Sequence, residues 1–304
     1  MIGTGTNEVG AVASSASFSF FTFAAAAGVK EIVAVTPAGP GGKISPALLA
    51  ALHLAGAMEV YGVGGAQAVA ALALGTKTIA PVDKIFGPGN RFVVEAKRQL
   101  FGRVAIDLLP GPSEILVIAD RTANPAWVAA DLLAQAEHGA DSGAVLLTDS
   151  RQILEATVRE IAKQAATLPR GEILRASLKN ATLALVSSMD EAVRLANAYA
   201  SEHVSLQVKK PRALAPQLVT AGAIFLGGYS PVAVGDFLAG PSHELPTGGA
   251  GKSFAGLTAD QFQRRTSLVE LDRRSLEKSV PLVEAFARVE GLDAHGRSAR
   301  IRLA

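Results

Sequence analysis

Two short segments of the sequence bring together side chains that can do chemistry. In the first, Gln135 and His138 stand three residues apart near the expected end of an apolar helix, so their side chains point the same way. A neutral imidazole beside an amide oxygen can face a metal ion or a polar ligand. A polar helix end, at which His138 merely interacts favourably with the helix dipole, is the alternative interpretation.

The second segment places Glu202 directly before His203, where a predicted helix gives way to a predicted strand. A carboxylate beside an imidazole is a candidate acid/base pair, although a solvated loop pair fits the local pattern equally well. His243, in a Gly/Pro-rich loop, and His295, just beyond the last helix, also lie at element ends, where sites are usually built. His53 lies inside an apolar helix and is predicted to be packed there.

Composition excludes several classes of protein. The 304 residues carry 29 basic and 27 acidic side chains, a net charge of +2, which argues against binding to nucleic acid or an anionic membrane. The absence of cysteine excludes disulfides, thiolate metal sites and thiol nucleophiles, so a metal would need histidine, carboxylate or amide ligands. The apolar run 11–27 is too short and too rich in serine to span a membrane, and we expect it to be a core helix.

The first third of the chain has the pattern of a parallel sheet. Expected strands at 31–35, 60–63 and 84–86 are each followed by a Gly/Pro loop and a helix, which indicates a Rossmann-like domain. The dinucleotide fingerprint is absent, because Gln67 and Phe92 stand where a third glycine would fall. The pattern therefore favours a nucleotide without proving one.

A second run of alternating strands and helices follows. Strands are expected at 115–119, 144–147, 181–186, 204–208 (half-exposed) and 223–226, with helices at 124–138, 150–167 and 188–199. Asn124 and Pro125 predict the start of the first of these helices, and Gly139 predicts its C′ stop. After a short strand at 266–271, the helix at 275–289 has too little apolar mass to fold alone, so it should dock on the body or on a second subunit.

The predicted fold class is therefore α/β. We expect two Rossmann-like parallel-sheet domains, the second incomplete at its N-terminal part, and a small helical C-terminal tail. The expected division is 1–113 for NAD binding, 114–256 for zinc, substrate and catalysis, and 257–304 as a dimer-docking tail.

From about residue 29 onward the chain closely resembles the histidinol dehydrogenase family. Several long blocks, in the family's order, carry this resemblance. They are Val63-Gly64-Gly65-Ala66-Gln67-Ala68, Phe86-Gly87-Pro88-Gly89-Asn90, Gly111-Pro112-Ser113-Glu114, Gln135-Ala136-Glu137-His138, Ser201-Glu202-His203, Gly235-Asp236 and Glu290-Gly291-Leu292-Asp293-Ala294-His295.

The resemblance implies a cytoplasmic, homodimeric enzyme of histidine biosynthesis. Such an enzyme uses Zn²⁺ and two NAD⁺ to oxidise L-histidinol to L-histidine through histidinal. By resemblance, the zinc ligands fall on Gln135, His138, Asp236 and His295, and the catalytic pair on Glu202 and His203. Substrate contacts fall on Ser113, His203, Glu290 and the metal ligands, with His243 lining the pocket, and NAD contacts fall on Gln67 and Asn90.

In this scheme the metal orients the substrate, His203 accepts the alcohol proton, and Glu202 activates the water that hydrates the aldehyde. The family's C-terminal tail reaches into the neighbouring subunit's site, so the resemblance also implies shared active sites. Neither nucleic acid nor a membrane is an expected partner.

The start of the chain departs from the family. Residues 1–8 stand where the family has a further N-terminal segment and a tyrosine-proline-glycine-glycine loop that touches NAD, so we expect an N-terminally truncated product. Two alternatives remain open beside histidinol oxidation. One is a paralogue that acts on another alcohol, such as a sulfonated diol, and the other is an inactive fragment that binds only metal or a partner chain.

Overall fold

A computed structural model describes residues 2–5, 8–12, 18–240 and 244–304 of the protein. The chain forms two compact units, one made of residues 5–263 and the other of residues 1–4 with 264–304. The larger unit contains two five-stranded sheets in which all strand pairs described are parallel. The predicted α/β class with parallel sheets is therefore confirmed.

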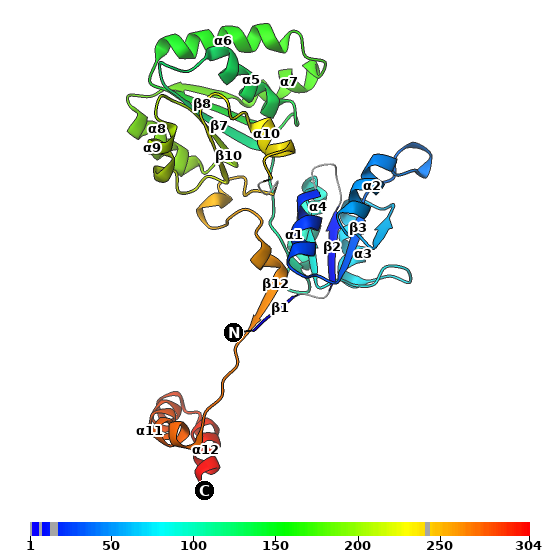
Figure 1. Ribbon diagram of the computed structural model, residues 1–304, viewed down its shortest axis with the longest axis vertical. Coiled ribbons are helices and arrows are strands. Elements are labelled where there is room, and N and C mark those ends of the chain that lie inside the picture. Colours follow the sequence, from blue (N-terminus) through cyan, green and yellow to red (C-terminus); the bar gives the residue numbers. More distant parts are fainter. Residues whose placement is uncertain (1, 6–7, 13–17, 241–243) are drawn as a thin grey trace. The chain divides into compact units, whose positions relative to one another are not determined.

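The first sheet has the strand order β4-β3-β2-β5-β6 (Figure 1). Its strands alternate their side chains between two helical layers, so Ile32 of β3 packs toward α1 and α2, and Val35 packs toward α3 and α4. The elements are β2 (Glu8–Val12), α1 (Phe18–Ala26), β3 (Glu31–Val35), α2 (Pro46–Leu54), β4 (Glu59–Tyr61), α3 (Gly65–Leu74), β5 (Lys84–Phe86), α4 (Arg91–Leu100) and β6 (Ala105–Ile106).

The apolar run 11–27 differs from its prediction as a single core helix. Its start belongs to β2, which pairs with both β3 and β5, and its later part forms α1, where Phe20 and Phe21 are buried. Residues 13–17 lie outside the described residues. The local sequence of the run does not predict a strand, because the run is short and rich in serine. β2 forms because it pairs with two neighbouring strands, β3 and β5.

The second sheet has the order β11-β10-β7-β8-β9. Helices α5 and α6 lie on one face of this sheet and α8 and α9 on the other (Figure 1). Side chains at Ile115 and Val117 pack toward α5 and α6, whereas Leu116 and Ile118 pack toward α8 and α9. The elements are β7 (Glu114–Ala119), α5 (Pro125–Ala136), β8 (Gly143–Thr148), α6 (Arg151–Ala165), α7 (Gly171–Ser177), β9 (Thr182–Leu185), α8 (Met189–Tyr199), β10 (His203–Gln207), α9 (Pro211–Leu214), β11 (Ala223–Leu226) and α10 (Val232–Phe237).

Four local predictions are wrong in detail. Strand β10 is buried along its whole length, not half-exposed, because strands flank it on both sides and helices cover both faces. Helix α5 ends at Ala136 with Glu137 as its C-cap, so Gly139 is not the C′ residue and has no positive φ. His53 lies in α2 as expected but is exposed, and the strand expected at 266–271 ends at Thr266.

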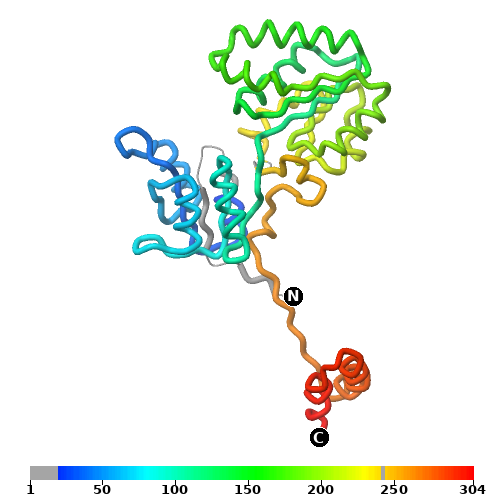
Figure 2. The backbone as a smooth tube through the Cα atoms, turned by 180° about the vertical axis from the view of Figure 1, so that it is seen from behind, coloured from blue at the N-terminus to red at the C-terminus, as the bar shows by residue number. Residues whose placement is uncertain are grey.

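The smaller unit is mainly helical. Helices α11 (Arg273–Glu290) and α12 (Asp293–Arg300) pack on each other, and a Cβ at Gly296 would stand 3.3 Å from that of Ala287 (Figure 2). Strands β1 (Ile2–Gly5) and β12 (Gln263–Thr266) form a two-stranded sheet. Phe286 and Val289 of α11 are 67% and 86% exposed, so the smaller unit by itself has an apolar face.

Short 3₁₀ turns complete the fold: η1 (Pro40–Gly42), η2 (Leu178–Asn180), η3 (Ala215–Gln217), η4 (Ala250–Lys252), η5 (Ala259–Phe262) and η6 (Ile301–Leu303). Phe262 at the end of η5 stacks on Phe86 of β5 with ring centroids 4.2 Å apart, and both are fully buried. The segment after the second sheet therefore returns to close the core of the first sheet. In the described part of the chain, no helix is long and apolar enough to cross a membrane.

Candidate active site

A cavity of about 340 Å³ lies among loops at the ends of both sheets. The first sheet contributes the loop after β5, at the carboxyl end of its strands, which is where open parallel sheets usually bind ligands. The second sheet contributes the amino ends of β7 and β10 instead. The lining residues are Phe20, Pro88, Gly89, Pro110, Gly111, Ser113, His138, Glu202, His203, Asp236, Glu244, Leu245 and Thr247.

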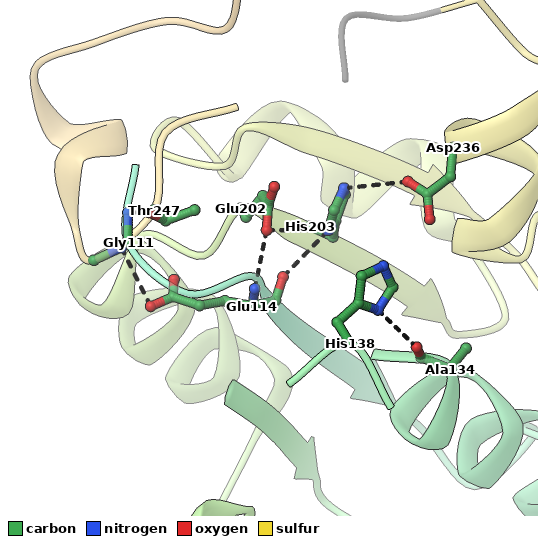
Figure 3. A network of polar contacts seen from close by, with 9 residues as sticks. Gly111, Glu114, Ala134, His138, Glu202, His203, Asp236 and Thr247 are labelled. Atoms are coloured by element: carbon green, nitrogen blue, oxygen red, sulfur yellow. Dashed lines mark hydrogen bonds and ion pairs between the residues drawn. The ribbon is translucent and has the colours of Figure 1, made fainter. Parts of the chain in front are cut away.

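The main chain of Glu114 holds the two expected catalytic side chains. Its N–H donates to Glu202 Oε2 over 2.9 Å, and its carbonyl oxygen lies 3.3 Å from His203 Nδ1 (Figure 3). This geometry follows from the pairing of β7 with β10, in which His203 lies opposite Ile115. Glu202 Oε2 also lies 3.7 Å from His203 Nδ1, so the carboxyl and imidazole groups meet at one point of the cavity wall.

The contact with the Glu114 carbonyl favours one tautomer of His203. If Nδ1 carries the proton and donates to that carbonyl, Nε2 is the basic nitrogen. His203 Nε2 lies 3.9 Å from Asp236 Oδ1, and the His203 ring packs at a tilt against Phe225. Gly235 permits this arrangement, because a Cβ at that position would stand 2.5 Å from the Phe225 ring.

Burial raises the pKa of Glu202 to about 8, and the nearby carboxyl groups of Glu114 and Asp236 add to that rise. The hydrogen bonds from the Glu114 N–H and from Ser113 act in the opposite direction but are outweighed. A carboxyl group with a pKa near neutrality can both release and accept a proton under physiological conditions, which suits general acid/base work.

Two further buried carboxyl groups surround Glu202. Burial raises the pKa of Glu114, whose Oε1 accepts a hydrogen bond from the Gly248 N–H. Burial also raises the pKa of Glu244 well above its usual range, and the neighbouring carboxyl group of Asp107 reinforces this. The cavity wall thus carries the carboxyl groups of Glu202, Asp236 and Glu244, whose ionised forms a bound cation would stabilise.

A buried ion pair between Lys97 and Asp107 holds the loop after β5 in place. Lys97 Nζ lies 2.6 Å from Asp107 Oδ1 and donates to the Gly87 carbonyl oxygen over 2.5 Å. The Gly87 N–H in turn donates to Asp107 Oδ2 over 2.6 Å. Gly89 must lack a side chain, since a Cβ there would come within 2.4 Å of Val93. Hence the loop enters the cavity wall in one defined shape.

The expected metal ligands are only partly brought together. The imidazole of His138 points toward His203 and Asp236, and its Nδ1 lies 3.0 Å from the Ala134 carbonyl oxygen (Figure 3). A histidine held in this way presents Nε2 to a metal. Gln135 is buried beside it, outside the cavity lining, and none of the described residues is a hydrogen-bond partner of its Nε2.

The remaining expected ligand, His295, belongs to the smaller unit. There it lines a separate hollow of about 340 Å³ together with Glu290, an expected substrate contact. Within the described ranges, no three His, Asp or Glu side chains form a group that could hold a metal ion. The described residues of the larger unit thus supply nitrogen and oxygen donors of the kinds that zinc accepts, but not a full ligand set.

Of the other expected site residues, one lines the cavity, one lies outside the described residues and two lie outside the cavity lining. Ser113 lines the cavity, whereas His243 lies outside the described residues. Gln67 is exposed near the start of α3 and does not line the cavity. Asn90 is the N-cap of α4, where its Oδ1 accepts from the Phe92 N–H over 3.0 Å, although its neighbours Pro88 and Gly89 do line the cavity.

Several residues of the site had no assigned role in the sequence. The sequence gives Glu114 only as the last residue of a family block, and Thr247 accepts a hydrogen bond from the Gly111 N–H. Lys97 and Asp107 form a buried ion pair, and the carboxyl group of Glu244, which lines the cavity, is a neighbour of Asp107. The only sequence signal for Lys97 is a charge on the apolar face of α4, one turn after Val93.

Comparison with known proteins agrees with these features. The model of the histidinol dehydrogenase family matches residues 9–303. The histidinol dehydrogenase of Rhodopseudomonas palustris is 50% identical over 278 residues, which cover 91% of this chain and 64% of that protein. That of Bacillus subtilis is 48% identical over 277 residues, covering 91% and 65%. The chain therefore spans just under two thirds of the length of these curated relatives.

Solved structures give the same result. The crystal structure of a histidinol dehydrogenase from Elizabethkingia anophelis matches with a TM-score of 0.93 and 37% identity, covering 99% of this chain and 72% of that chain. An acetylating aldehyde dehydrogenase from Geobacillus thermoglucosidasius matches with a TM-score of 0.55 and 17% identity, covering 90% and 77%. The second likeness concerns the fold alone.

The raised pKa of Glu202 predicts how stability changes with pH in protein freed of metal by a chelator. The folded state holds the Glu202 proton up to a pKa of about 8, whereas the unfolded chain releases it near 4.5. The contribution of Glu202 to stability is therefore full below pH 4.5 and is lost as pH rises toward 8, by on the order of a few kcal/mol.

Glu202→Gln should abolish the part of the pH dependence that comes from Glu202. The free energy of unfolding of the variant should therefore increase relative to that of wild type as pH rises from 5 to 8. Urea unfolding at both pH values measures the difference. The exposed Glu172→Gln variant on α7 is the control and should follow wild type. Parallel stability curves for wild type and Glu202→Gln would contradict the shift.

Proposed function

Because the chain belongs to the histidinol dehydrogenase family, we propose that it oxidises L-histidinol to L-histidine with NAD⁺, through histidinal. The observation that carries the proposal is the Glu202–His203 pair, held by the main chain of Glu114 at the cavity that Asp236 and His138 also line. An alcohol oxidation followed by an aldehyde oxidation needs a base in each step, and this pair supplies two.

His203 is the base of the first step. Oxidation of the alcohol removes a proton from the hydroxyl group as a hydride leaves the carbinol carbon. With its Nδ1 bound to the Glu114 carbonyl, His203 can accept that proton at Nε2, and Asp236 at 3.9 Å stabilises the imidazolium that forms. NAD⁺, when bound, supplies the hydride acceptor in both steps.

Glu202 is the base of the second step. The aldehyde must add water before it can lose a second hydride, and a carboxylate can remove a proton from that water. The pKa of about 8 makes Glu202 basic enough for this role once it is deprotonated. Its hydrogen bond from the Glu114 N–H fixes the carboxyl group at the cavity wall.

Zinc would be held by His138, Asp236 and Gln135 from one chain, with His295 completing the set. These side chains offer only nitrogen and oxygen donors, and the buried amide nitrogen of Gln135 has no hydrogen-bond partner in the part of the chain that the structure describes. Bound zinc would orient the imidazole and amine of histidinol. The surrounding carboxyl groups of Glu114 and Glu244 favour a cation at this place.

We assign the parts of the chain by role. Residues 1–113 form a Rossmann-like NAD-binding domain, whose loops at Gln67 and Gly87–Asn90 contact the cofactor. Residues 114–256 form the zinc and substrate domain, and residues 257–304 form the dimer-docking tail, of which 264–304 make up the separate helical unit. The carboxyl-end position of the Gly87–Asn90 loop supports the first assignment.

A homodimer with shared active sites would use His295 and Glu290, which belong to the smaller unit, at the cavity of the larger unit of a second chain. Among the described residues no three His, Asp or Glu side chains form a group that could hold a metal ion, so the site needs a further ligand. The smaller unit also exposes apolar side chains at Leu282, Phe286 and Val289, which a partner surface would bury. Docking of this unit on a second subunit meets both needs.

The activity and the metal are tested together. Purified, dialysed protein should hold one zinc per chain by elemental analysis and should reduce NAD⁺ with L-histidinol as the only substrate. A sulfonated diol serves as the alternative substrate. Turnover of histidinol by metal-free protein would refute the zinc assignment. A metal-loaded protein that does not oxidise histidinol would refute histidinol as the substrate.

The division of labour between the two bases predicts different losses in the two half-reactions. Glu202→Gln should slow the oxidation of histidinal by about 10²–10⁴-fold and the oxidation of histidinol by much less, since only the aldehyde step needs an activated water. Separate rates with histidinol and histidinal measure this. Equal losses in both steps would contradict the division.

Shared sites predict complementation between two inactive variants, provided that the wild-type chain is active. His203→Ala and His295→Ala chains should each be inactive alone, and activity should return after subunit exchange. Random pairing makes half of the dimers mixed, so about a quarter of all sites are intact. If one variant carries an affinity tag, co-purification of the untagged variant verifies exchange. If exchange is verified in this way and no activity returns, His295 serves its own chain.

A further inference from the structure

A buried polar contact joins the helix that precedes His138 to the strand that begins at His203. Asp131 of α5 is only 7% exposed, and its Oδ2 accepts hydrogen bonds from Ser205 Oγ over 3.2 Å and from Gln207 Nε2 over 3.3 Å. Ser205 and Gln207, both buried in β10, are also hydrogen-bonded to each other over 3.2 Å. None of these three residues lines the cavity.

The spacing along both elements relates this contact to the site. Asp131 and Gln135 are four residues apart in α5, so they share one face of the helix, and His138 follows one residue beyond the C-cap. His203, Ser205 and Gln207 alternate along β10 and therefore share the face that α5 covers. On the strand, Ser205 and Gln207 thus lie two and four residues after His203. On the helix, Asp131 lies about one turn before Gln135, an expected metal ligand.

Apolar packing alone would hold α5 on the sheet. Ile115, Val117, Val128 and Leu132 already form the core between them. A carboxyl group placed beside this core costs stability, and its burial among neutral donors raises the pKa of Asp131 to about 6. Unlike apolar packing, however, hydrogen bonds to two residues of one strand fix the position of the helix along that strand.

We propose that Asp131 is a positioning residue, which sets the register of α5 on β10 and thereby places Gln135 and His138 relative to His203. The inference rests on the proposed function for its consequence, the alignment of metal ligands with the base. The tie between helix and strand can be tested without metal or substrate.

Four chains test it: wild type, Asp131→Ala, Asp131→Asn and Val193→Ala. Asparagine keeps an oxygen acceptor at the same place, whereas alanine leaves the Ser205 and Gln207 donors buried without it. Val193 is a buried residue of α8 on the opposite face of the sheet, so Val193→Ala lowers stability without touching the contact. The comparison is made at temperatures where the variants have equal stability.

In chelator-treated protein, amide hydrogen exchange should quicken in 131–138 and 203–207 for Asp131→Ala, and for neither Val193→Ala nor Asp131→Asn. In zinc competition experiments, Asp131→Ala should lose about 10–100-fold in affinity, a typical effect of a residue that orients metal ligands, and Asp131→Asn should lose less than a few-fold.

Exchange in Asp131→Ala that matches Val193→Ala would overturn the proposal, as would equal zinc affinity in Asp131→Ala and wild type. A wild-type chain that binds no zinc refutes the metal assignment of the proposed function instead. In that case the exchange comparison still decides whether Asp131 ties α5 to β10.

Discussion

The parallel pairing of β7 with β10 is the constraint on which the candidate site depends. Because His203 lies opposite Ile115, the peptide groups of Glu114 meet Glu202 and His203. A slip of one residue would turn His203 toward the face that α8 covers. The site thus shares the rigidity of a strand that is buried along its whole length.

Buried carboxyl groups give the site its electrostatic character. Glu114, Glu202 and Glu244 all have pKa values raised by burial, and the fully buried Lys97 is paired with Asp107 below them. Such a cluster costs folding free energy, because each group resists taking its charged form in a poorly solvated place. A bound cation would offset part of that cost, which links ligand binding to stability.

The two sheets contribute opposite ends to the cavity. The first sheet contributes a Gly/Pro loop at the carboxyl end of β5, and the Lys97–Asp107 pair fixes the shape of that loop. The second sheet contributes the amino ends of β7 and β10 and the end of α5, which are parts of regular secondary structure. A cofactor bound at the loop and a substrate bound at the strand ends would therefore meet in the cavity between them.

Local features were predictable from the sequence alone. The strands at 31–35 and 84–86, the helix start at Asn124 and the α/β class agree with their predictions, since periodicity and capping depend on neighbours within a few residues. Family blocks also pointed to Ser113, His138, Glu202, His203 and Asp236, which line one cavity.

Tertiary structure alone decided the rest. The strand β2, the full burial of β10, and the main-chain contacts of Glu114 depend on partners up to 89 residues away along the chain. The same holds for the Asp131 contact with β10, which no spacing within α5 announces. These features follow from which strand lies beside which, and that choice is made by packing of the whole sheet, not by any short run of residues.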